Sequence, residues 1–464
     1  MDTRVQLFLD QLKGKRVTFC GVGVSNTPVA ELFAKKGAQI VICDKRSREQ
    51  LGAIGDRLAK CGAEFRLGAD YLAHLDGDIV FRTPGMKYTL PELDDARRRI
   101  AVTSEMEMFF ELCPCPIIAV TGSDGKTTTT TVISEMLKAQ GKKVYLGGNI
   151  GVALLPLIEQ ITPDDVAVVE LSSFQLISMR RSPDVAVITN ITPNHLDMHK
   201  DMDEYVQAKK NIFLHQNAFA RAVLNHDNEL THSFVPETRG QVLEFSRRGE
   251  VKNGAFLRAD GMIVMRLNGQ DTEVFPAADI RIPGAHNIEN YMAAISAVWG
   301  RVDIENMHQV ARNFSGVEHR AEFVRELNGV RYYNDSIATT PSRTISGTLS
   351  LFDQKIIVIL GGYDKKIPFD PLGPVVAKKV KTAILLGVTA PKIEAAITGC
   401  PEYQVGSPEI IRVENLEQAV RKAHEIAQKG DIVSLSPACA SFDQFPNYET
   451  RGERFKDYVR ELGE

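Results

Sequence analysis

The chain has 464 residues, a formal net charge of −4, a 44% share of hydrophobic residues and a 25% share of charged residues. These proportions are typical of a globular protein, and they give no reason to expect nucleic acid as a partner. The N-terminus lacks the apolar core of a signal peptide, and no stretch approaches the roughly 20 apolar residues of a membrane span. At roughly 150 residues per domain, the length predicts about three domains.

Seven cysteines are scattered along the chain, and Cys113 and Cys115 form the only close pair. Their spacing does not match the Cys-x-x-Cys or Cys/His patterns of zinc sites. We therefore interpret them as reduced thiols and expect a cytoplasmic protein without disulfides.

The first predicted unit, residues 1–103, has the pattern of an α/β fold. Its main strands and helix are expected at residues 16–20, 28–36, 38–43 and 78–81. Gly21 and Gly23 follow the first strand and Asp44 ends the next, which is half of a dinucleotide fingerprint. Asn26 replaces the third glycine. The residues alone leave three interpretations open: NAD, another nucleotide or nucleotide-sugar phosphate, or an ordinary Rossmann-like turn.

A second unit, residues 104–315, contains the most informative motif of the chain. A short apolar strand at 117–120 leads into Thr121-Gly-Ser-Asp-Gly-Lys-Thr127, and an amphipathic helix is expected at 129–140. This arrangement predicts a phosphate-binding loop, in which backbone N–H groups and a helix N-terminus hold the phosphates. The longer G-x-x-x-x-G-K-[ST] pattern would need glycine at Val120, so this loop is a shorter form. The competing interpretation is an ordinary strand-to-helix turn.

Polar groups follow the next two buried strands of this unit, at the sheet edge where α/β folds bind ligands. Glu170 ends the strand at 166–169, and we predict that it holds magnesium, which prefers oxygen ligands; a solvated strand-end carboxylate is the alternative. His195 lies in the turn after the strand at 185–188. A single histidine is more often a turn or cap residue than a ligand.

A helix predicted at 205–216 carries a lysine on its apolar face. The inward-facing stripe consists of Tyr205, Ala208, Lys209, Ile212 and Phe213, whereas Lys210 is expected to face away. Burial would favour a neutral, nucleophilic amine at Lys209; the alternative is a side chain that extends to the edge of the apolar face.

The rest of the second unit and a third unit complete the chain. Residues 240–275 have the pattern of an antiparallel excursion with hairpin turns, and a helix is expected at 288–299. In residues 316–464, strands are expected at 355–360, 382–386 and 432–435, each followed by polar residues. The predicted fold class is α/β with three domains: a Rossmann-like N-terminal domain, a central phosphate-loop ATPase-type domain and a C-terminal Rossmann-like domain.

Several motifs occur together and in a characteristic order: Thr121 to Thr127, Glu170-Leu-Ser-Ser173, Asn190 to His195, the lysine helix, His286-Asn287, His319-Arg320 and Asn334-Asp335-Ser336. In this combination the chain resembles the Mur ligases, the ATP-dependent amide ligases that build the peptidoglycan stem peptide. The run Leu435-Ser-Pro-Ala-Cys-Ala-Ser-Phe-Asp-Gln-Phe445 is most similar to members that add D-glutamate to UDP-N-acetylmuramoyl-L-alanine. The Asp-Asn-Pro-Arg tetrapeptide expected of diaminopimelate- or lysine-adding members does not occur.

The resemblance implies a role for each matching residue. ATP contacts are implied for Gly122, Ser123, Asp124, Gly125, Lys126, Thr127, Thr128, Asn287, Arg320 and Asp335. Contacts to the UDP substrate are implied for Val24, Ser25, Asp44, Lys45, Arg46, Thr83, Asn149 and Ser172. D-Glutamate contacts are implied for Thr339, Lys365, Ser441 and Tyr448. Catalytic roles are implied for Lys126, Glu170, His195 and Lys209, and metal ligation for Thr127, Glu170, His195 and Lys209.

The resemblance also implies the cofactors: ATP, two Mg²⁺ ions and a CO₂-derived carbamate on Lys209. The substrates would be UDP-N-acetylmuramoyl-L-alanine and D-glutamate, joined through an acyl phosphate by a monomer without nucleic-acid or membrane partners. At Ile337 many relatives carry a lysine near the glutamate pocket, so that part of the pocket differs. The alternatives are another Mur-type or folylpolyglutamate-type ligase, a nicotinamide-dependent dehydrogenase and a non-catalytic ATP-binding regulator.

Overall fold

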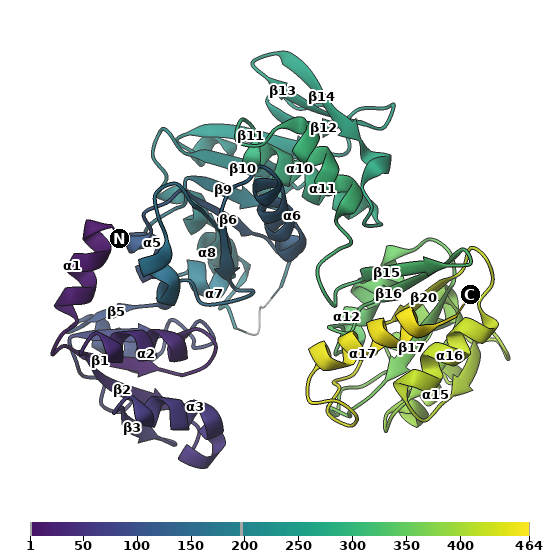
Figure 1. Cartoon of the computed structure of the whole chain (residues 1–464), viewed down its shortest axis with the longest axis horizontal. Coiled ribbons are helices and arrows are strands. Elements are labelled where there is room, and N and C mark those ends of the chain that lie inside the picture. The colour runs from purple at the N-terminus through teal and green to yellow at the C-terminus, as the bar shows by residue number, and fades with distance from the viewer. Residues whose placement is uncertain (1, 195–197, 464) are drawn as a thin grey trace. The chain divides into compact units, whose positions relative to one another are not determined.

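The computed structural model describes residues 2–194 and 198–463, and these divide into two compact units (Figure 1). Unit 1 comprises Met1–Asp279 and His286–Arg312, and unit 2 comprises Ile280–Ala285 and Asn313–Glu464. Two mainly parallel sheets lie in unit 1 and a third lies in unit 2, which confirms the predicted α/β class. Within the described ranges, no helix has both the length and the apolar character needed to cross a membrane.

The first sheet is parallel throughout, with strand order β3-β2-β1-β4-β5. Its strands are β1 (Arg16–Cys20), β2 (Gln39–Asp44), β3 (Glu64–Leu67), β4 (Ile79–Arg82) and β5 (Ala101–Thr103). The helices of this part are α1 (Thr3–Gln11), α2 (Asn26–Lys35), α3 (Arg48–Lys60), α4 (Pro91–Arg97) and α5 (Glu105–Leu112). Phe19, Phe33 and Phe81 pack together between the sheet and α2, with ring centroids 5.1–6.1 Å apart.

The second sheet has strand order β14-β13-β12-β11-β10-β9-β6-β8-β7. Its strands are β6 (Ile117–Thr121), β7 (Val144–Gly148), β8 (Val166–Glu170), β9 (Val185–Ile188), β10 (Arg221–Asn225), β11 (Gln241–Ser246), β12 (Gly254–Leu257), β13 (Met262–Leu267) and β14 (Gln270–Pro276). The predicted antiparallel excursion over 240–275 was wrong for its first part. β11 pairs in parallel with both β10 and β12, and only β12, β13 and β14 are antiparallel to one another.

Helices and short 3₁₀ turns flank this second sheet. The helices are α6 (Lys126–Ala139), α7 (Ser173–Leu176), α8 (Met202–Leu214), α9 (Glu229–His232), α10 (Ala285–Val298) and α11 (Ile304–Asn313), and the 3₁₀ turns are Leu155–Gln160, Val235–Glu237 and Ala277–Asp279. Of these helices, α6, α8 and α10 begin before their predicted first residues. Gly125, in a left-handed conformation with φ 77°, lets α6 begin at Lys126, and the Asp201 side chain caps α8 by accepting the Glu204 N–H.

Unit 2 contains one sheet with strand order β15-β16-β20-β17-β18-β19, parallel except for the β15–β16 pair. Its strands are β15 (Glu322–Leu327), β16 (Val330–Asn334), β17 (Ile356–Gly361), β18 (Val380–Leu386), β19 (Glu409–Arg412) and β20 (Ile432–Leu435). Its helices are α12 (Pro341–Ser346), α13 (Thr348–Leu351), α14 (Leu372–Lys379), α15 (Ala390–Thr398), α16 (Leu416–Ile426) and α17 (Tyr448–Glu461). Because β17 and β20 are buried along their whole length, they read as continuous apolar runs in the sequence.

Candidate active site

The predicted phosphate loop forms the turn between β6 and α6, at the carboxyl edge of the second sheet. Two of its glycines have positive φ, 151° at Gly122 and 77° at Gly125. A Cβ on Gly122 would lie 1.9 Å from Thr189 Oγ1, and one on Gly125 would lie 2.4 Å from Asn290 Oδ1. The short form of the loop therefore needs glycine at both positions for conformation and for space.

The turn after β9 holds the loop from one side. The backbone N–H of Ser123 donates to the carbonyl of Asn190 at 2.8 Å, and that of Asp124 donates to Asn190 Oδ1 at 3.0 Å. The Thr189 hydroxyl donates to the carbonyl of Asp124 at 2.5 Å. These contacts hold the loop backbone in place, and phosphate recognition by backbone N–H groups depends on such a fixed backbone.

Two lysines converge on one carbonyl oxygen of this loop. Lys126 Nζ donates to the carbonyl of Gly122 at 3.0 Å, and Lys209 Nζ donates to the same oxygen at 2.8 Å. Lys209 is only 2% exposed, which confirms the prediction that it lies on the buried face of α8. Burial lowers the pKa of Lys209 well below its ordinary value, and repulsion from Lys126 lowers it further, although Glu170 and Asp124 oppose this. Burial therefore shifts the equilibrium of Lys209 toward its neutral amine, in the predicted direction.

The prediction for Lys210, the next residue of α8, was wrong. We expected it to face away from the core, but its side chain is buried, pairs with Glu237 and lies 5.3 Å from the centre of the Phe234 ring. The segment after α9 covers this second face of α8, and the helical pattern of α8 itself gives no sign of that cover.

Glu170 and Asn149 meet at the end of β8 beside the loop. Glu170 is 1% exposed, and its Oε1 accepts a hydrogen bond from Asn149 Nδ2 at 2.6 Å. Its Oε2 is buried and has no hydrogen-bond partner among the described residues. The alternative of a solvated strand-end carboxylate was therefore wrong. A buried carboxylate oxygen without a partner is costly, and a cation would satisfy it.

His195 lies outside the described residues, but a second histidine that sequence reasoning missed is close to the loop. His199 is buried, with Nε2 2.8 Å from Ser173 Oγ and Nδ1 3.2 Å from Glu204 Oε2. Its ring contacts Tyr205, whose hydroxyl lies 2.9 Å from Ser123 Oγ. The only signal in the sequence was its position shortly before the lysine helix. Ser172, predicted to contact the substrate, caps α7 through the Gln175 N–H.

The start of α10 adds an amide pair to the same region. Asn290 Nδ2 donates to Asn287 Oδ1 at 2.9 Å, and Thr129 Oγ1 of helix α6 donates to Asn290 Oδ1 at 3.2 Å. Asn287, predicted to contact the nucleotide, is thus linked through Asn290 to the first turn of α6, the helix that follows the phosphate loop. Asn290 was not predicted, because a single amide on a mostly apolar helix carries no motif.

In the first sheet, Asp44 is engaged by its own neighbours. The buried carboxylate accepts the Val22 N–H at 3.0 Å and pairs with the Arg46 guanidinium at 2.8 Å. Burial raises the pKa of Asp44, but the hydrogen bonds from Arg46 and Val22 outweigh it and hold the pKa below its ordinary value. Asn26 Nδ2 donates to the Gly21 carbonyl at 2.8 Å, so the residue that replaces the third glycine closes the turn.

The other predicted substrate contacts of this sheet border the same turn. A Cβ on Gly21 would lie 2.6 Å from Thr83 Cγ2, so Thr83 directly faces the turn. Val24 is 77% exposed, a large apolar side chain left open to solvent, and Lys45 is also exposed whereas Ser25 is half-buried. The structure therefore places six residues at the carboxyl edge of the first sheet, after β1, β2 and β4: Val24, Ser25, Asp44, Lys45, Arg46 and Thr83.

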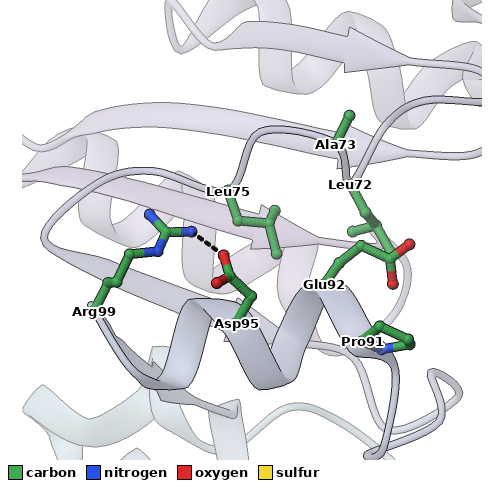
Figure 2. Close-up of a pocket in the computed structure, with 7 residues that line it drawn as sticks. All are labelled: Leu72, Ala73, Leu75, Pro91, Glu92, Asp95 and Arg99. Carbon is green, nitrogen blue, oxygen red and sulfur yellow. Dashed lines mark hydrogen bonds and ion pairs between the residues drawn. The ribbon is translucent and has the colours of Figure 1, made fainter.

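A separate cavity of about 290 Å³ lies elsewhere in this part of unit 1 (Figure 2). It is lined by Leu72, Ala73, Leu75, Pro91, Glu92, Asp95 and Arg99. Arg99 pairs with Asp95, four residues earlier, at 2.6 Å, and Glu92 is the other charged residue of the lining. None of the residues predicted to bind a ligand lines it.

In unit 2, Asp335 follows β16 and is fully enclosed. Its carboxylate accepts hydrogen bonds from Ser436 Oγ and Thr348 Oγ1, both at 2.8 Å, and from the Ala321 N–H at 3.2 Å. Burial raises its pKa to about 6. Both neighbours of Arg320 have positive φ, 61° at His319 and 42° at Ala321, and Arg320 itself is exposed. The Asp335 contact to Ala321 thus helps to hold the strained turn that presents Arg320.

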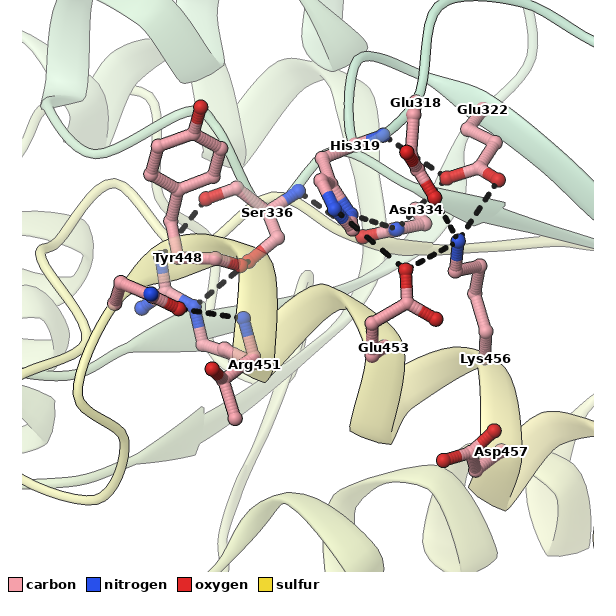
Figure 3. A network of polar contacts seen from close by, with 12 residues as sticks. Glu318, His319, Glu322, Asn334, Ser336, Tyr448, Arg451, Glu453, Lys456 and Asp457 are labelled. Atoms are coloured by element: carbon pink, nitrogen blue, oxygen red, sulfur yellow. Dashed lines mark hydrogen bonds and ion pairs between the residues drawn. The ribbon is translucent and has the colours of Figure 1, made fainter. Parts of the chain in front are cut away.

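A buried arginine that the sequence did not predict holds two loops near the residues predicted to contact D-glutamate (Figure 3). Arg451 of α17 is 2% exposed and donates to the Ser336 carbonyl at 2.9 Å, the Cys439 carbonyl at 3.0 Å and the Ala440 carbonyl at 3.1 Å. It thereby ties the loop after β16 to the loop after β20, which contains Ser441. Ser336 Oγ donates to the backbone carbonyl of Tyr448 at 2.8 Å.

Thr339 and Lys365 lie together in the same unit, with Lys365 Nζ donating to Thr339 Oγ1 at 3.4 Å. Ser441 is buried, whereas Lys365 is exposed. At the position where a lysine was expected, the Ile337 N–H donates to the His319 carbonyl at 3.1 Å, so its backbone supports the turn that presents Arg320.

Comparison with known proteins places this fold and loop in a family. Residues 120–298 match the Mur ligase middle domain, and residues 319–439 match the Mur ligase, glutamate ligase domain. The chain belongs to the Mur ligase family, and it is an ATP-dependent ligase of that class.

Two relatives that match along their whole length carry the same name. The chain is 51% identical to the UDP-N-acetylmuramoylalanine--D-glutamate ligase of Acetivibrio thermocellus over 466 residues, 100% of each chain. It is 48% identical to the protein of the same name from Clostridium botulinum (strain Okra) over 464 residues, again 100% of each chain.

Two solved structures share the fold at low sequence identity. A UDP-N-acetylmuramate-alanine ligase of Thermotoga maritima has 18% identity and a TM-score of 0.56, with 96% of this chain and 99% of that chain covered. A UDP-N-acetylmuramoyl-L-alanyl-D-glutamate--2,6-diaminopimelate ligase has 16% identity and a TM-score of 0.56, covering 92% and 94%.

Proposed function

We propose that the chain joins D-glutamate to UDP-N-acetylmuramoyl-L-alanine at the expense of ATP, giving ADP and phosphate, as a step of peptidoglycan precursor synthesis. The observation that carries this proposal is 51% identity, along the whole of both chains, to a relative that bears the name of that reaction. The phosphate loop with its buried lysine and carboxylate supports the same chemistry.

The chemistry requires that a carboxylate be activated before an amine attacks it. In the proposed reaction the L-alanyl carboxylate takes the γ-phosphoryl group of ATP, which gives an acyl phosphate and ADP. The amine of D-glutamate then attacks the acyl carbon and gives up a proton, and the tetrahedral oxyanion collapses to an amide as the C–O bond to phosphate breaks and phosphate is released. The first step brings two anions together, so the protein must offset negative charge.

The loop residues offset that charge. The N-terminus of α6 and the backbone N–H groups of Gly122 to Thr128 would hold the phosphates, and the Lys126 ammonium would neutralise them. Lys126 now contacts the carbonyls of Gly122 and Ser123, so we propose that it exchanges these contacts for phosphate oxygens. Asn287, Arg320 and Asp335 are the proposed contacts for the rest of the nucleotide.

Two magnesium ions and a carbamate on Lys209 belong to the proposal, and the surroundings of Glu170 and Lys209 support them. Thr127 and Glu170 would hold one ion, because Glu170 Oε2 is buried without a partner. Lys209 and His195 would hold the other, and burial favours the neutral Lys209 amine, which is the form that combines with CO₂. Bound magnesium would neutralise the charge of the phosphate and carboxylate oxygens.

The two substrates would contact different sheets of the fold. The UDP end would contact the cluster of Val24, Ser25, Asp44, Lys45, Arg46 and Thr83. Each oxygen of Asp44 already accepts two hydrogen bonds from Val22 and Arg46, which argues against its use for the ribose hydroxyls of NAD. Asn149 and Ser172 would contact the muramoyl part. D-Glutamate would contact Thr339, Lys365, Ser441 and Tyr448.

The proposal also covers the wider organisation of the protein. We propose three domains at residues 1–103, 104–315 and 316–464, which bind the UDP substrate, ATP and D-glutamate. We also propose a cytoplasmic monomer. The seven cysteines, all within the described residues, are free, which supports a reducing compartment.

The decisive experiment measures phosphate release with ATP, Mg²⁺ and UDP-N-acetylmuramoyl-L-alanine against D-glutamate, L-glutamate, L-lysine and meso-diaminopimelate. Release with D-glutamate alone is expected. Lys126→Met should abolish it, whereas Lys138→Met, at the exposed end of the same helix, should not. Release with a different amino acid but not with D-glutamate would make the chain another Mur-type ligase.

A further inference from the structure

Two histidines and a glutamate meet at a surface that the proposed ligation reaction does not use. His226 directly follows β10, His232 ends α9, and Glu244 lies in β11. Parallel pairing of β10 with β11 brings His226 beside Glu244, and the His226 N–H donates to the Phe245 carbonyl at 3.0 Å. The short helix then turns His232 back toward the same carboxylate.

The three side chains point at one position. The Nδ1 atoms of His226 and His232 lie 3.1 and 2.6 Å from the same oxygen, Oε1 of Glu244. The two imidazole rings are 4.5 Å apart at 73° to each other, and the three potential ligand atoms lie within 4.8 Å of one another. Ligand atoms around tetrahedral zinc at about 2.0–2.1 Å are roughly 3.4 Å apart. Only a small rotation of these side chains would therefore be needed.

The backbone that carries these groups is fixed. Asn225 Nδ2 donates to the Thr189 carbonyl at 2.8 Å, and the Thr231 hydroxyl donates to the Asn225 carbonyl at 2.6 Å. The Asn228 side chain caps α9 by accepting the Thr231 N–H. The residues next to both histidines are thus held by hydrogen bonds, while the His232 side chain, 49% exposed, keeps the freedom to adjust.

The donor set has a clear chemical preference. Imidazole nitrogens with one carboxylate suit zinc and related transition metals, whereas Mg²⁺ and Ca²⁺ prefer oxygen ligands alone. Nδ1 of each imidazole lies within hydrogen-bond distance of Glu244 Oε1. A metal at Nδ1 requires the neutral tautomer that carries its proton on Nε2.

We propose that His226, His232 and Glu244 form a surface site for a divalent transition-metal ion, with Zn²⁺ as the best match and water completing the coordination. A second His–carboxylate group, formed by Glu318, His319 and Glu453, is different (Figure 3). There the ammonium of Lys456 already lies 2.8 Å from both Glu318 and Glu453. No protein cation takes that role at Glu244 among the contacts of the described chain.

The test uses the full chain without nucleotide and titrates it with Co²⁺, whose visible absorption is intense in a tetrahedral site with nitrogen ligands. We expect one Co²⁺ per chain at this site, displaced by Zn²⁺. Losing an outer-shell partner of a metal ligand weakens binding about 10–100-fold, so loss of a direct ligand should weaken it at least about tenfold. The variants are His226→Ala, His232→Ala and Glu244→Gln.

His308→Ala is the matched control, because His308 pairs with the single carboxylate of Asp279 at 2.6 Å. It should bind Co²⁺ like the parent chain. Glu244→Gln preserves the side-chain shape, and circular dichroism of every variant checks that it is folded. The proposal is overturned if the parent chain gives no tetrahedral Co²⁺ spectrum, or if folded His232→Ala and Glu244→Gln variants keep it unchanged.

Discussion

The buried carboxyl group of Asp335 should make the stability of unit 2 depend on pH, and the size of this effect can be tested. Its carboxylate is 3% exposed, and its hydrogen-bond donors, Ser436, Thr348 and the Ala321 N–H, do not compensate fully for the loss of water. Burial therefore raises its pKa from 3.8 to about 6. The folded chain binds a proton at Asp335 more tightly than the unfolded chain does.

The sign of the pH dependence follows from this shift. Between pH 4 and 6 the folded state holds more protons at Asp335 than the unfolded state, so its contribution to stability decreases as the pH rises. A rise of about two pKa units corresponds to about 3 kcal/mol, lost as the pH passes through about 6. Asn at this position is neutral at every pH, so Asp335→Asn should remove the pH-dependent part of this term.

Hydrogen exchange of peptides covering β16 and β20 measures the relevant stability, because it reports local unfolding free energy at each pH. The difference between parent and Asp335→Asn should change by about 3 kcal/mol from pH 4 to pH 8, in favour of the variant at high pH. Asp353→Asn, at an exposed carboxyl of the same unit, is the control. Parallel pH profiles for the parent and Asp335→Asn would refute the reasoning.

Three further predictions concern the proposed ligation. Lys209→Ala should lower kcat at least about 100-fold in the phosphate-release assay, whereas Lys210→Met should keep most of it, since only Lys209 reaches the loop. Gly122→Ala should weaken binding of a fluorescent ATP analogue at least tenfold, because its Cβ would lie 1.9 Å from Thr189 Oγ1; ordinary affinity would contradict the loop geometry. Arg451→Lys should raise the KM for D-glutamate more than that for ATP in steady-state kinetics, because lysine cannot hold the Ser336, Cys439 and Ala440 carbonyls together; equal effects would indicate a general loss of structure.

Local sequence patterns determined the elements of this protein. The glycine turn between an apolar strand and an amphipathic helix predicted the phosphate loop, because Gly122 and Gly125 meet a backbone requirement that other residues rarely meet. The stripe on α8 predicted that Lys209 is buried, since a periodic face shows which side chains point toward the sheet. Both signals come from a few consecutive residues, so the sequence contains them directly.

Tertiary structure alone decided which groups meet. Nothing near Lys210 in the sequence indicates that Phe234 and Glu237 cover it, and nothing near Arg451 indicates that it binds carbonyls from two distant loops. His199 likewise gains its environment from α7 and α8 together. Such contacts depend on how separate elements pack, and packing leaves no periodic pattern in the chain. The sequence therefore identified the phosphate loop and its buried lysine, whereas only the fold placed both lysines on the carbonyl of Gly122.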